Sequence, residues 1–369
     1  MVKGALSSRN SFIGISSPEW GILRFGKTDA PYAQSTSRMD PFSGMIGSYQ
    51  VIMGNTGGDN RVEFGTRLDH SIWYESPDLR GFKFAALFSP GQNRGYQNDN
   101  IASGESDCTG GNIPGSGGTF GLQGAGVYNC SDGSFGNAVS ASLTYTHGPF
   151  YAVAAYERHF GVNRSSDITG LGGNAPFYVV QADTADEDAA KVAVQYEFPT
   201  HTTVSGIFES LHRYVPDYLQ FQNERQRLGT WLAIEQHLTP VDDVAVGWAH
   251  AFRTPGDPGQ HNTSLAAAPY APADPTIGGD MTGGAGSNNS ANMYTAVYKR
   301  KIMPGLTWYT NVAATINGPY AHYDLGAGGH GVTTDCHDGY GGAGGVTSGP
   351  HCWAGGHLFG VSTGLNYNF

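Results

Sequence analysis

The chain has 369 residues and a formal net charge of -11, with only 14% charged residues but 55 glycines, 20 tyrosines and 18 phenylalanines. The negative charge and the lack of clustered lysine and arginine exclude a nucleic-acid-binding protein, because phosphate contacts need such clusters. No segment reaches the roughly 18 to 20 consecutive apolar residues of a membrane-spanning helix. Because the composition is typical of short strands joined by glycine-rich loops, we expect an all-β protein with a single domain over residues 1–369.

Apolar and polar residues alternate in segments spread through the whole chain, which is the periodicity of β-strands. The alternation is clearest near the carboxyl end, where Phe359, Val361 and Leu365 alternate with glycine, serine and asparagine. The pattern predicts thirteen strands, at 10–16, 20–27, 68–76, 81–89, 138–146, 149–157, 187–198, 202–212, 225–238, 242–253, 290–301, 305–316 and 356–369.

The connections between these strands alternate between short and long. Short turns occur around residues 18, 78, 148, 200, 240 and 304, and a shorter loop lies near 214–223. Transmembrane barrels have short periplasmic turns and long external loops, whereas compact soluble domains rarely carry so many long loops. We therefore predict an antiparallel transmembrane β-barrel. Its long glycine-rich, asparagine-rich and serine-rich connections are 28–66, 91–137, 158–186, 254–288 and 317–355, of which 91–137 and 317–355 are expected to be extracellular.

The odd number of predicted strands conflicts with closure of such a barrel. The first and last strands would run in the same direction, so they would meet as parallel neighbours in an otherwise antiparallel wall. Residues 1–6 also lack the charged region, apolar region and cleavage site of an export signal. We expect that strands are missing at the amino end, or that one strand does not show the alternating pattern.

Two neighbouring segments near the amino end carry a family resemblance. Residues 8–16 read Ser-Arg-Asn-Ser-Phe-Ile-Gly-Ile-Ser, and residues 20–27 read Trp-Gly-Ile-Leu-Arg-Phe-Gly-Lys. With 29–32, 67–74 and 81–87 they resemble, in order, the fourth and fifth strands and following segments of Gram-negative trimeric porins. The resemblance implies a sixteen-stranded barrel with three strands absent here, a bacterial outer-membrane location and a homotrimer. Tyr367 and the terminal Phe369 resemble the assembly signal of these proteins.

The same resemblance implies a pore constriction. Residues 28–66 look like the loop that folds into the pore, and its acids Asp29, Asp40 and Asp59 would face a basic wall. Opposed charges in a narrow aqueous pore orient dipolar solutes and bias ion choice. The matching positions give Arg9 and Arg67 for the wall, and strand alternation adds Arg24 and Lys83; the alternative is that these are ordinary surface charges.

A second group of charged residues lies on the segment 225–238. Arg225, Arg227 and Glu235 share one strand parity, opposite Leu228, Leu232 and Ile234, so they face the lumen if the aliphatic residues face lipid. They form either a ladder of solute-binding charges or solvated lumen charge.

The four cysteines are expected to form disulfides within two loops, Cys108 with Cys130 and Cys336 with Cys352, because the cell surface is oxidising and each pair is close in sequence. The alternative is a metal site from Cys336, His337, His351 and Cys352, although neither cysteine pair has Cys-x-x-Cys spacing. We expect no metal and no cofactor.

The favoured function is passive diffusion of ions and small hydrophilic solutes through a general porin, which would contact outer-membrane lipid and lipopolysaccharide. A solute-selective porin and a surface adhesin or structural barrel without transport are the alternatives. We expect no enzyme activity, because no Gly-x-Ser-x-Gly, Walker or His-Glu-x-x-His motif occurs.

Overall fold

The computed structural model describes residues 10–53, 64–65, 67–90, 137–163, 184–214, 226–254, 288, 290–319, 321, 323–327 and 355–367. These residues form two short helices and thirteen strands. Helix α1 is Pro31–Ser37 and helix α2 is Gln50–Met53. The strands are β1 Ser11–Ser17, β2 Gly21–Asp29, β3 Arg67–Glu75, β4 Phe82–Pro90, β5 Asn137–His147, β6 Phe150–Asn163, β7 Thr184–Glu197, β8 Thr202–Arg213, β9 Arg227–His237, β10 Asp242–Ala251, β11 Ala291–Met303, β12 Leu306–Asn317 and β13 His357–Tyr367.

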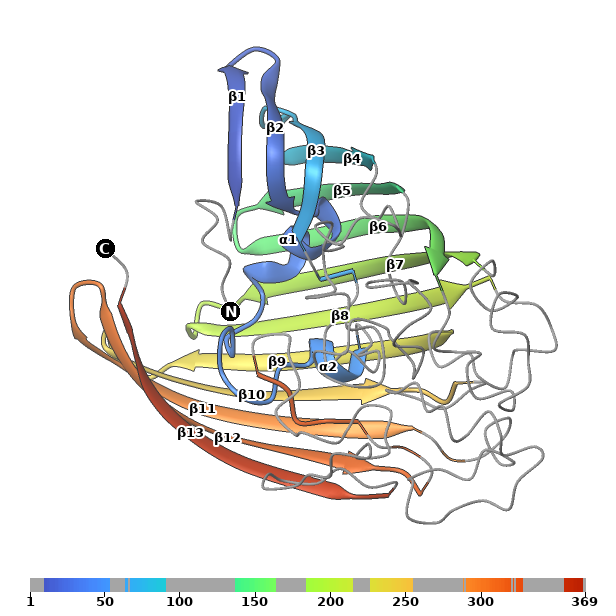
Figure 1. The fold of residues 1–369 in the computed structure, drawn as a ribbon. Helices are drawn as coiled ribbons and strands as arrows, with labels where there is room; N and C mark the ends of the chain where they lie inside the picture. The colour runs from blue at the N-terminus through green and yellow to red at the C-terminus, as the bar shows by residue number, and fades with distance from the viewer. Residues whose placement is uncertain are drawn as a thin grey trace, which may run out of the picture.

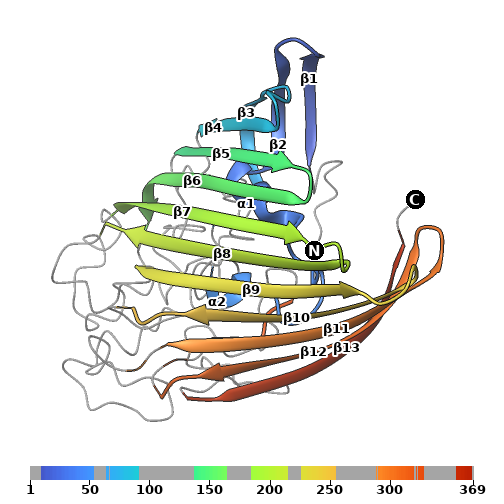
Figure 2. The same cartoon turned by 180° about the vertical axis from the view of Figure 1, so that it is seen from behind.

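All thirteen strands belong to one antiparallel sheet in which each strand pairs with its neighbours in sequence, from β1 to β13. The sheet curves strongly, so that it has a concave face and a convex face (Figures 1 and 2). Among the described residues β1 and β13 are not paired with each other. The all-β antiparallel fold and the thirteen strands predicted from the alternation are confirmed, with the main difference that β6 and β7 extend into the predicted loop 158–186.

The convex face is apolar and the concave face carries small or polar residues. In β7, for example, Val192 and Val194 are 56% and 54% exposed on the convex side, whereas Ala189 and Ala193 are buried on the concave side. This difference follows from the side-chain period of two in a strand. We call the rim that contains short turns, such as the turn between β7 and β8, the short-turn end of the sheet. The opposite rim, which contains connections such as the one between β8 and β9, is the long-connection end.

The segment 30–53, which follows β2 and contains α1 and α2, lies inside the curve of the sheet (Figure 1). Ala30 is extended, as a residue before proline prefers, and Pro31 begins α1 at the position where a helix tolerates proline. Helix α1 contacts β4, β5 and β6, and α2 contacts β9, β10 and β11. The core of the molecule lies between this segment and the concave face, where Phe42 and Met53 pack against wall positions occupied by Gly247 and Gly229.

Neither α1 nor α2 is long and apolar enough to cross a membrane, and the described residues contain no other helix.

Candidate functional site: the inner segment and the concave face

The first half of the segment 30–53 is fastened to the middle of the sheet. The backbone N–H of Tyr32 donates to Ser140 Oγ on β5 at 2.9 Å, and its hydroxyl donates to Glu209 on β8. Tyr151 on β6 donates to the carbonyl of Ser35 at 2.7 Å. Lys191 on β7 donates from Nζ to Thr36 Oγ1 at 2.8 Å. The side chains of four neighbouring strands therefore hold α1 against the wall.

The second half is fastened to the later strands. Thr295 on β11 donates to the carbonyl of Gly47 at 3.0 Å, and Asn311 on β12 donates to the carbonyl of Ile46 at 2.8 Å. Arg227 on β9 donates from Nε and Nη2 to the carbonyl of Met53 at 3.2 and 3.0 Å. Seven strands, β5 to β9 with β11 and β12, thus hold the segment by side-chain hydrogen bonds.

A second piece of chain, 323–327, also lies within the concave face. Gly47 donates its backbone N–H to the carbonyl of Gly326 at 2.9 Å, and Ile46 forms an isolated antiparallel bridge with Ala327. Tyr323 is buried, and its hydroxyl accepts from Arg227 at 2.7 Å. The sequence placed these residues in the long external loop 317–355 and gave no signal for an inward course.

The predicted constriction residues at the start of the sheet form two ion pairs. Arg24 is paired with Glu75, and its guanidinium lies 4.7 Å from the ring centroid of Phe12. Arg67 Nε lies 3.2 Å from Asp29 Oδ1. Each of these arginines has a carboxylate as its immediate neighbour.

Lys83 has the strand parity of the concave face, shared with the buried Leu87 and Ser89, and is exposed. The predicted Arg9 and Asp59 lie outside the described residues.

Asp40 lies close to a charged pair on the wall. Glu235 on β9 accepts a hydrogen bond from Lys299 Nζ on β11 at 2.9 Å. Burial raises the pKa of Asp40 from 3.8 to about 6; the charge of Glu235 also raises it, while a hydrogen bond from the backbone N–H of Phe42 and the charge of Lys299 act in the opposite direction. The sequence predicts Asp40 as part of the constriction and Glu235 as part of the ladder on 225–238. In the structure the two carboxylates lie near each other.

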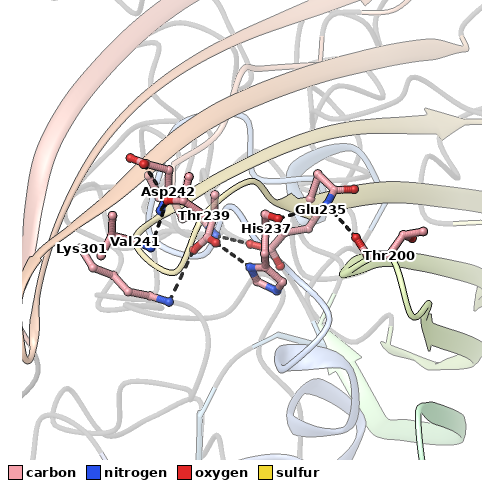
Figure 3. Close-up of polar contacts among 10 residues, drawn as sticks. Thr200, Glu235, His237, Thr239, Val241, Asp242 and Lys301 are labelled. Atoms are coloured by element: carbon pink, nitrogen blue, oxygen red, sulfur yellow. Dashed lines mark hydrogen bonds and ion pairs between the residues drawn. The ribbon is translucent and has the colours of Figure 1, made fainter.

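Next to this pair, a second group of charges lies at the short-turn end of the same strands (Figure 3). His237 Nδ1 is 2.5 Å from Asp243 Oδ1, and Lys301 Nζ is 4.0 Å from Asp243 Oδ2. Sequence reasoning missed Lys299 and Lys301, although both share strand parity with Val297, which faces the concave side. It also missed Arg38, which follows α1 and places its guanidinium 4.2 Å from the ring centroid of Tyr151.

The predicted ladder on 225–238 has a different role at its two ends. Glu235 is a partly exposed member of the charged pair with Lys299. Arg227 is buried and uses its donors on Met53 and Tyr323, so it anchors the two inward segments. Arg225 lies outside the described residues.

A buried charged cluster that the sequence did not indicate lies near the long-connection end of β6, β7 and β8. His159 Nε2 is 3.0 Å from Glu157 Oε1, and its Nδ1 is 2.9 Å from Glu187 Oε1. Arg213 Nε donates to Glu187 Oε2 at 2.9 Å. Phe64 stacks on the His159 ring, with the ring centroids 4.4 Å apart, so the cluster packs against this residue.

The remaining predictions fall largely outside the described residues, which include none of the four cysteines Cys108, Cys130, Cys336 and Cys352 and not Phe369. Tyr367 ends β13 and is exposed. In the part of the chain that the structure describes, no group of three or more histidine, cysteine, aspartate or glutamate side chains is placed to hold a metal ion. The alternative metal site on Cys336, His337, His351 and Cys352 also lies outside that part.

The molecule is thus a curved antiparallel sheet, in which each strand pairs with its neighbours in sequence, with a segment folded onto the concave face. The sequence profile described as Gram-negative porin matches residues 2–319. The chain belongs to the Gram-negative porin family. This membership confirms the family resemblance, the outer-membrane location and the expectation of a porin in place of an enzyme.

Two proteins that are similar to this porin have low sequence identity to it. It is 24% identical over 186 residues to an outer membrane porin protein of Bordetella pertussis, an alignment that covers 48% of this chain and 40% of that protein. Less than half of that relative's length is therefore matched. The anion-selective porin from Comamonas acidovorans has the same fold, with a TM-score of 0.57 and 15% identity over 98% of this chain and 78% of that one.

Proposed function

We propose that this porin forms a water-filled channel through the outer membrane, in which ions and small hydrophilic solutes diffuse passively. The observation that carries the proposal is the course of residues 30–53 across the concave face, where side chains of β5 to β9, β11 and β12 hold it by hydrogen bonds. A segment held inside the curve of the wall narrows the enclosed space. In a narrow aqueous passage, the charges on the surface determine which ions and solutes pass.

We further propose that the charged residues along this passage select solutes. Arg24 with Glu75, and Asp40 beside Glu235 and Lys299, supply both signs of charge, and Lys83 and Arg38 add positive charge. The ion pair of Asp29 with Arg67 belongs to the proposal through the family resemblance. Arg9 and Asp59 belong to the proposal through the family resemblance. Such fields orient dipolar solutes and penalise apolar ones, because low-dielectric walls focus the potential.

The proposed partners follow from the family. A homotrimer is implied by the resemblance to trimeric porins, and the apolar convex face suits contact with lipid and lipopolysaccharide of the outer membrane. Chemical cross-linking of the folded protein in detergent tests the trimer, since cross-linked species should end at three chains.

Planar-bilayer recording tests the channel. Insertion of the purified, folded protein should give stepwise increases in conductance, whereas a folded protein that inserts without conducting would contradict the proposal. Titration with single sugars, amino acids and carboxylates separates the two kinds of porin: a general porin shows no saturable block of current, and a solute-selective porin shows it with one class of solute.

A further inference from the structure

An exposed aromatic ring lies on the concave face of the first strands. Phe12 on β1 is 52% exposed, and it shares strand parity with Gly14. Gly14 pairs with Arg24, which in turn pairs with the buried Trp73, so this parity belongs to the concave face. Ile13, the neighbour of Phe12 in sequence, lies on the convex side and is also exposed. Contact with lipid therefore explains the exposure of Ile13 but not that of Phe12.

The Phe12 ring rests on the side chain of Trp73. The two rings meet edge to face, with their centroids 5.2 Å apart and an angle of 81° between their planes. Trp73 itself is buried in a small apolar cluster that includes Leu68 and Ala30, the first residue of the segment 30–53. The exposed ring is thus supported from below, beside the point at which the segment 30–53 begins.

A charged pair lies next to the same ring. Arg24 is paired with Glu75, and its guanidinium is 4.7 Å from the centroid of Phe12 and 5.8 Å from that of Trp73. Glu75 Oε1 also accepts from Trp73 Nε1 at 3.2 Å. Gly14 leaves room for the stem of the arginine, because a Cβ atom there would come within 2.9 Å of Arg24 Cγ. Both charged side chains remain partly exposed, so they can contact a solute.

An aromatic face beside a hydrogen-bond donor and an acceptor is suited to a sugar. The C–H groups on one face of a pyranose ring are weakly electropositive and pack on the negative face of an aromatic ring. A sugar hydroxyl both donates and accepts, so it can use a guanidinium N–H and a carboxylate oxygen together. We propose that Phe12, Arg24 and Glu75 form a binding subsite for a neutral pyranose sugar.

The charges of the subsite favour a neutral solute. Arg24 and Glu75 have opposite charges, so a carboxylate attracted by the arginine is repelled by the glutamate, and an ammonium group meets the reverse. The exposed Lys83 lies about 7 Å along β4 from the partner of Glu75, at roughly 3.4 Å per residue, where water weakens its attraction for an anion. The proposal rests on the proposed channel, and it names the class of solute that the wall of this channel binds.

Ligand-observed saturation-transfer NMR of the folded protein, in a detergent without a sugar headgroup, tests the class of solute. Glucose, glucuronate and glucosamine have the same ring and differ in charge in a mildly acidic buffer, so glucose should bind most tightly. Sorbitol is an open-chain polyol of similar size, and it should bind several-fold more weakly because it has no ring face to pack on Phe12. Binding of any of the other three as tightly as glucose would overturn the proposal.

The aromatic face has its own variant. Phe12→Leu keeps an apolar side chain but removes the ring, so it should weaken glucose binding about three- to ten-fold. Phe25→Leu is the matched control, because Phe25 lies on the adjacent strand β2 and is 44% exposed on the convex side. This variant should bind glucose as the wild type does. Equal affinities of the two variants would contradict the role of Phe12.

The charged pair is tested by a change of preference. Glu75→Gln keeps an acceptor for Arg24 and Trp73 but removes the negative charge, so glucuronate should gain affinity several-fold relative to glucose. Glu197→Gln is the control, since Glu197 is an exposed carboxylate of concave parity at the short-turn end of β7. An unchanged preference in Glu75→Gln, or the same change in both variants, would overturn the proposal.

Recording of channel current in parallel separates the subsite from the channel. Glucose should reduce the current of the wild type in a saturable manner, and Phe12→Leu should need a higher glucose concentration for the same reduction. A protein that conducts but shows no saturation transfer to glucose would overturn the subsite and leave the proposed channel intact. A protein that binds glucose with the expected response to the variants, but does not conduct, would contradict the channel and support the subsite.

Discussion

Asp40 joins the inner segment to the charges of the wall. Its carboxylate lies near Lys299 and Glu235, and burial raises its pKa to about 6. The residue therefore changes its charge within a pH range in which ordinary aspartates stay ionised.

We predict that cation preference falls as the pH is lowered from 7 to 5, because Asp40 becomes neutral through its pKa of about 6. Reversal potentials across a salt gradient measure this change. Asp40→Asn should remove this step and should already show the low-pH selectivity at pH 7, with its amide still able to accept from the backbone N–H of Phe42. An unchanged pH profile in the variant would contradict the prediction.

The same pKa has a consequence for stability. The folded-state pKa of Asp40 lies above the value of 3.8 expected for an unfolded chain, so folding takes up a proton. The stabilisation from this uptake is complete below about pH 4 and is lost as the pH rises through about 6. Asp40→Asn should therefore raise the midpoint of urea unfolding at pH 7 more than at pH 4.

Lys83 offers a test of the proposed passage by charge alone. Neutralisation in Lys83→Gln should shift selectivity towards cations, because an exposed positive charge on the concave face attracts anions. Arg300→Gln is the matched control, since Arg300 is exposed and lies at the same short-turn end but has the convex parity of Tyr294. The shift should appear in reversal potentials for the lysine variant only, and an equal shift in both would contradict the assigned faces.

At the level of single residues, the alternation along a strand predicts which face of the sheet a side chain lies on. Parity placed Lys83 and Glu235 on the concave face and Leu232 and Ile234 on the convex face, as the structure has them. Parity does not reveal which charges lie next to each other across strands. The pairing of Glu235 with Lys299 is therefore visible only in the register, and Arg38 belongs to a segment without regular alternation.

The inner segment is held close to the wall at Gly47. This residue has a positive φ of 78°, and a Cβ atom there would come within 2.5 Å of Ala313 Cβ and of Thr295 Oγ1. A residue with a side chain at this position must displace the segment or the wall.

We predict that Gly47→Ala destabilises the folded protein by roughly 2–5 kcal/mol, the sum of about 1–2 kcal/mol for the left-handed backbone and about 1–3 kcal/mol for overpacking. Single-channel conductance should also change, because the segment moves relative to the wall. Gly44→Ala is the control, since Gly44 has a φ of 79° but open space around the position of its Cβ. Gly44→Ala should lower the free energy of unfolding only by the backbone contribution. Urea unfolding of both variants in lipid vesicles measures the difference. Equal costs in the two variants would show that no close contact exists at Gly47.

The elements themselves were predictable to different degrees. Residues 30–53 of the segment 28–66 lie on the concave face, and the constriction of a pore by this segment stays a prediction. Its helices were not foreseen, because α1 and α2 have only seven and four residues and show no extended helical periodicity. The inward course of 323–327 depends on Arg227 and Gly47, which are remote in sequence, so no local pattern indicates it.

The convex face has to match lipid over the whole sheet. Val194 lies near the middle of the convex apolar residues of β7, between Val192 and Tyr196. We predict that Val194→Arg destabilises the protein in lipid vesicles by roughly 2–4 kcal/mol, as expected for a charge near the bilayer centre.

The same substitution in the short turn between β9 and β10, Val241→Arg, should cost only about 0–1 kcal/mol, since it lies at the edge of the apolar belt. Urea unfolding of both variants in vesicles measures the difference. A soluble sheet with a solvated convex face would show no such depth dependence.

For the whole molecule, alternation over many segments made the fold predictable, because every strand has one face towards lipid and one towards the interior. The thirteen strands that the described residues form, paired in sequence order, follow directly from that pattern. The pattern contains no information on what lies inside the curve, since inward positions accept small, polar and charged residues alike.

The hydrogen bond from Asn311 to the carbonyl of Ile46 joins residues 265 positions apart, whereas the strand pairs form between neighbours in sequence. Short connections close at little entropic cost, so hairpins can assemble one after another. The far anchors on β11 and β12 exist only after most of the wall is in place. We therefore expect that the width of the passage is set late in assembly. A chain that has inserted with its hairpins complete but without these anchors should conduct ions before it selects among solutes.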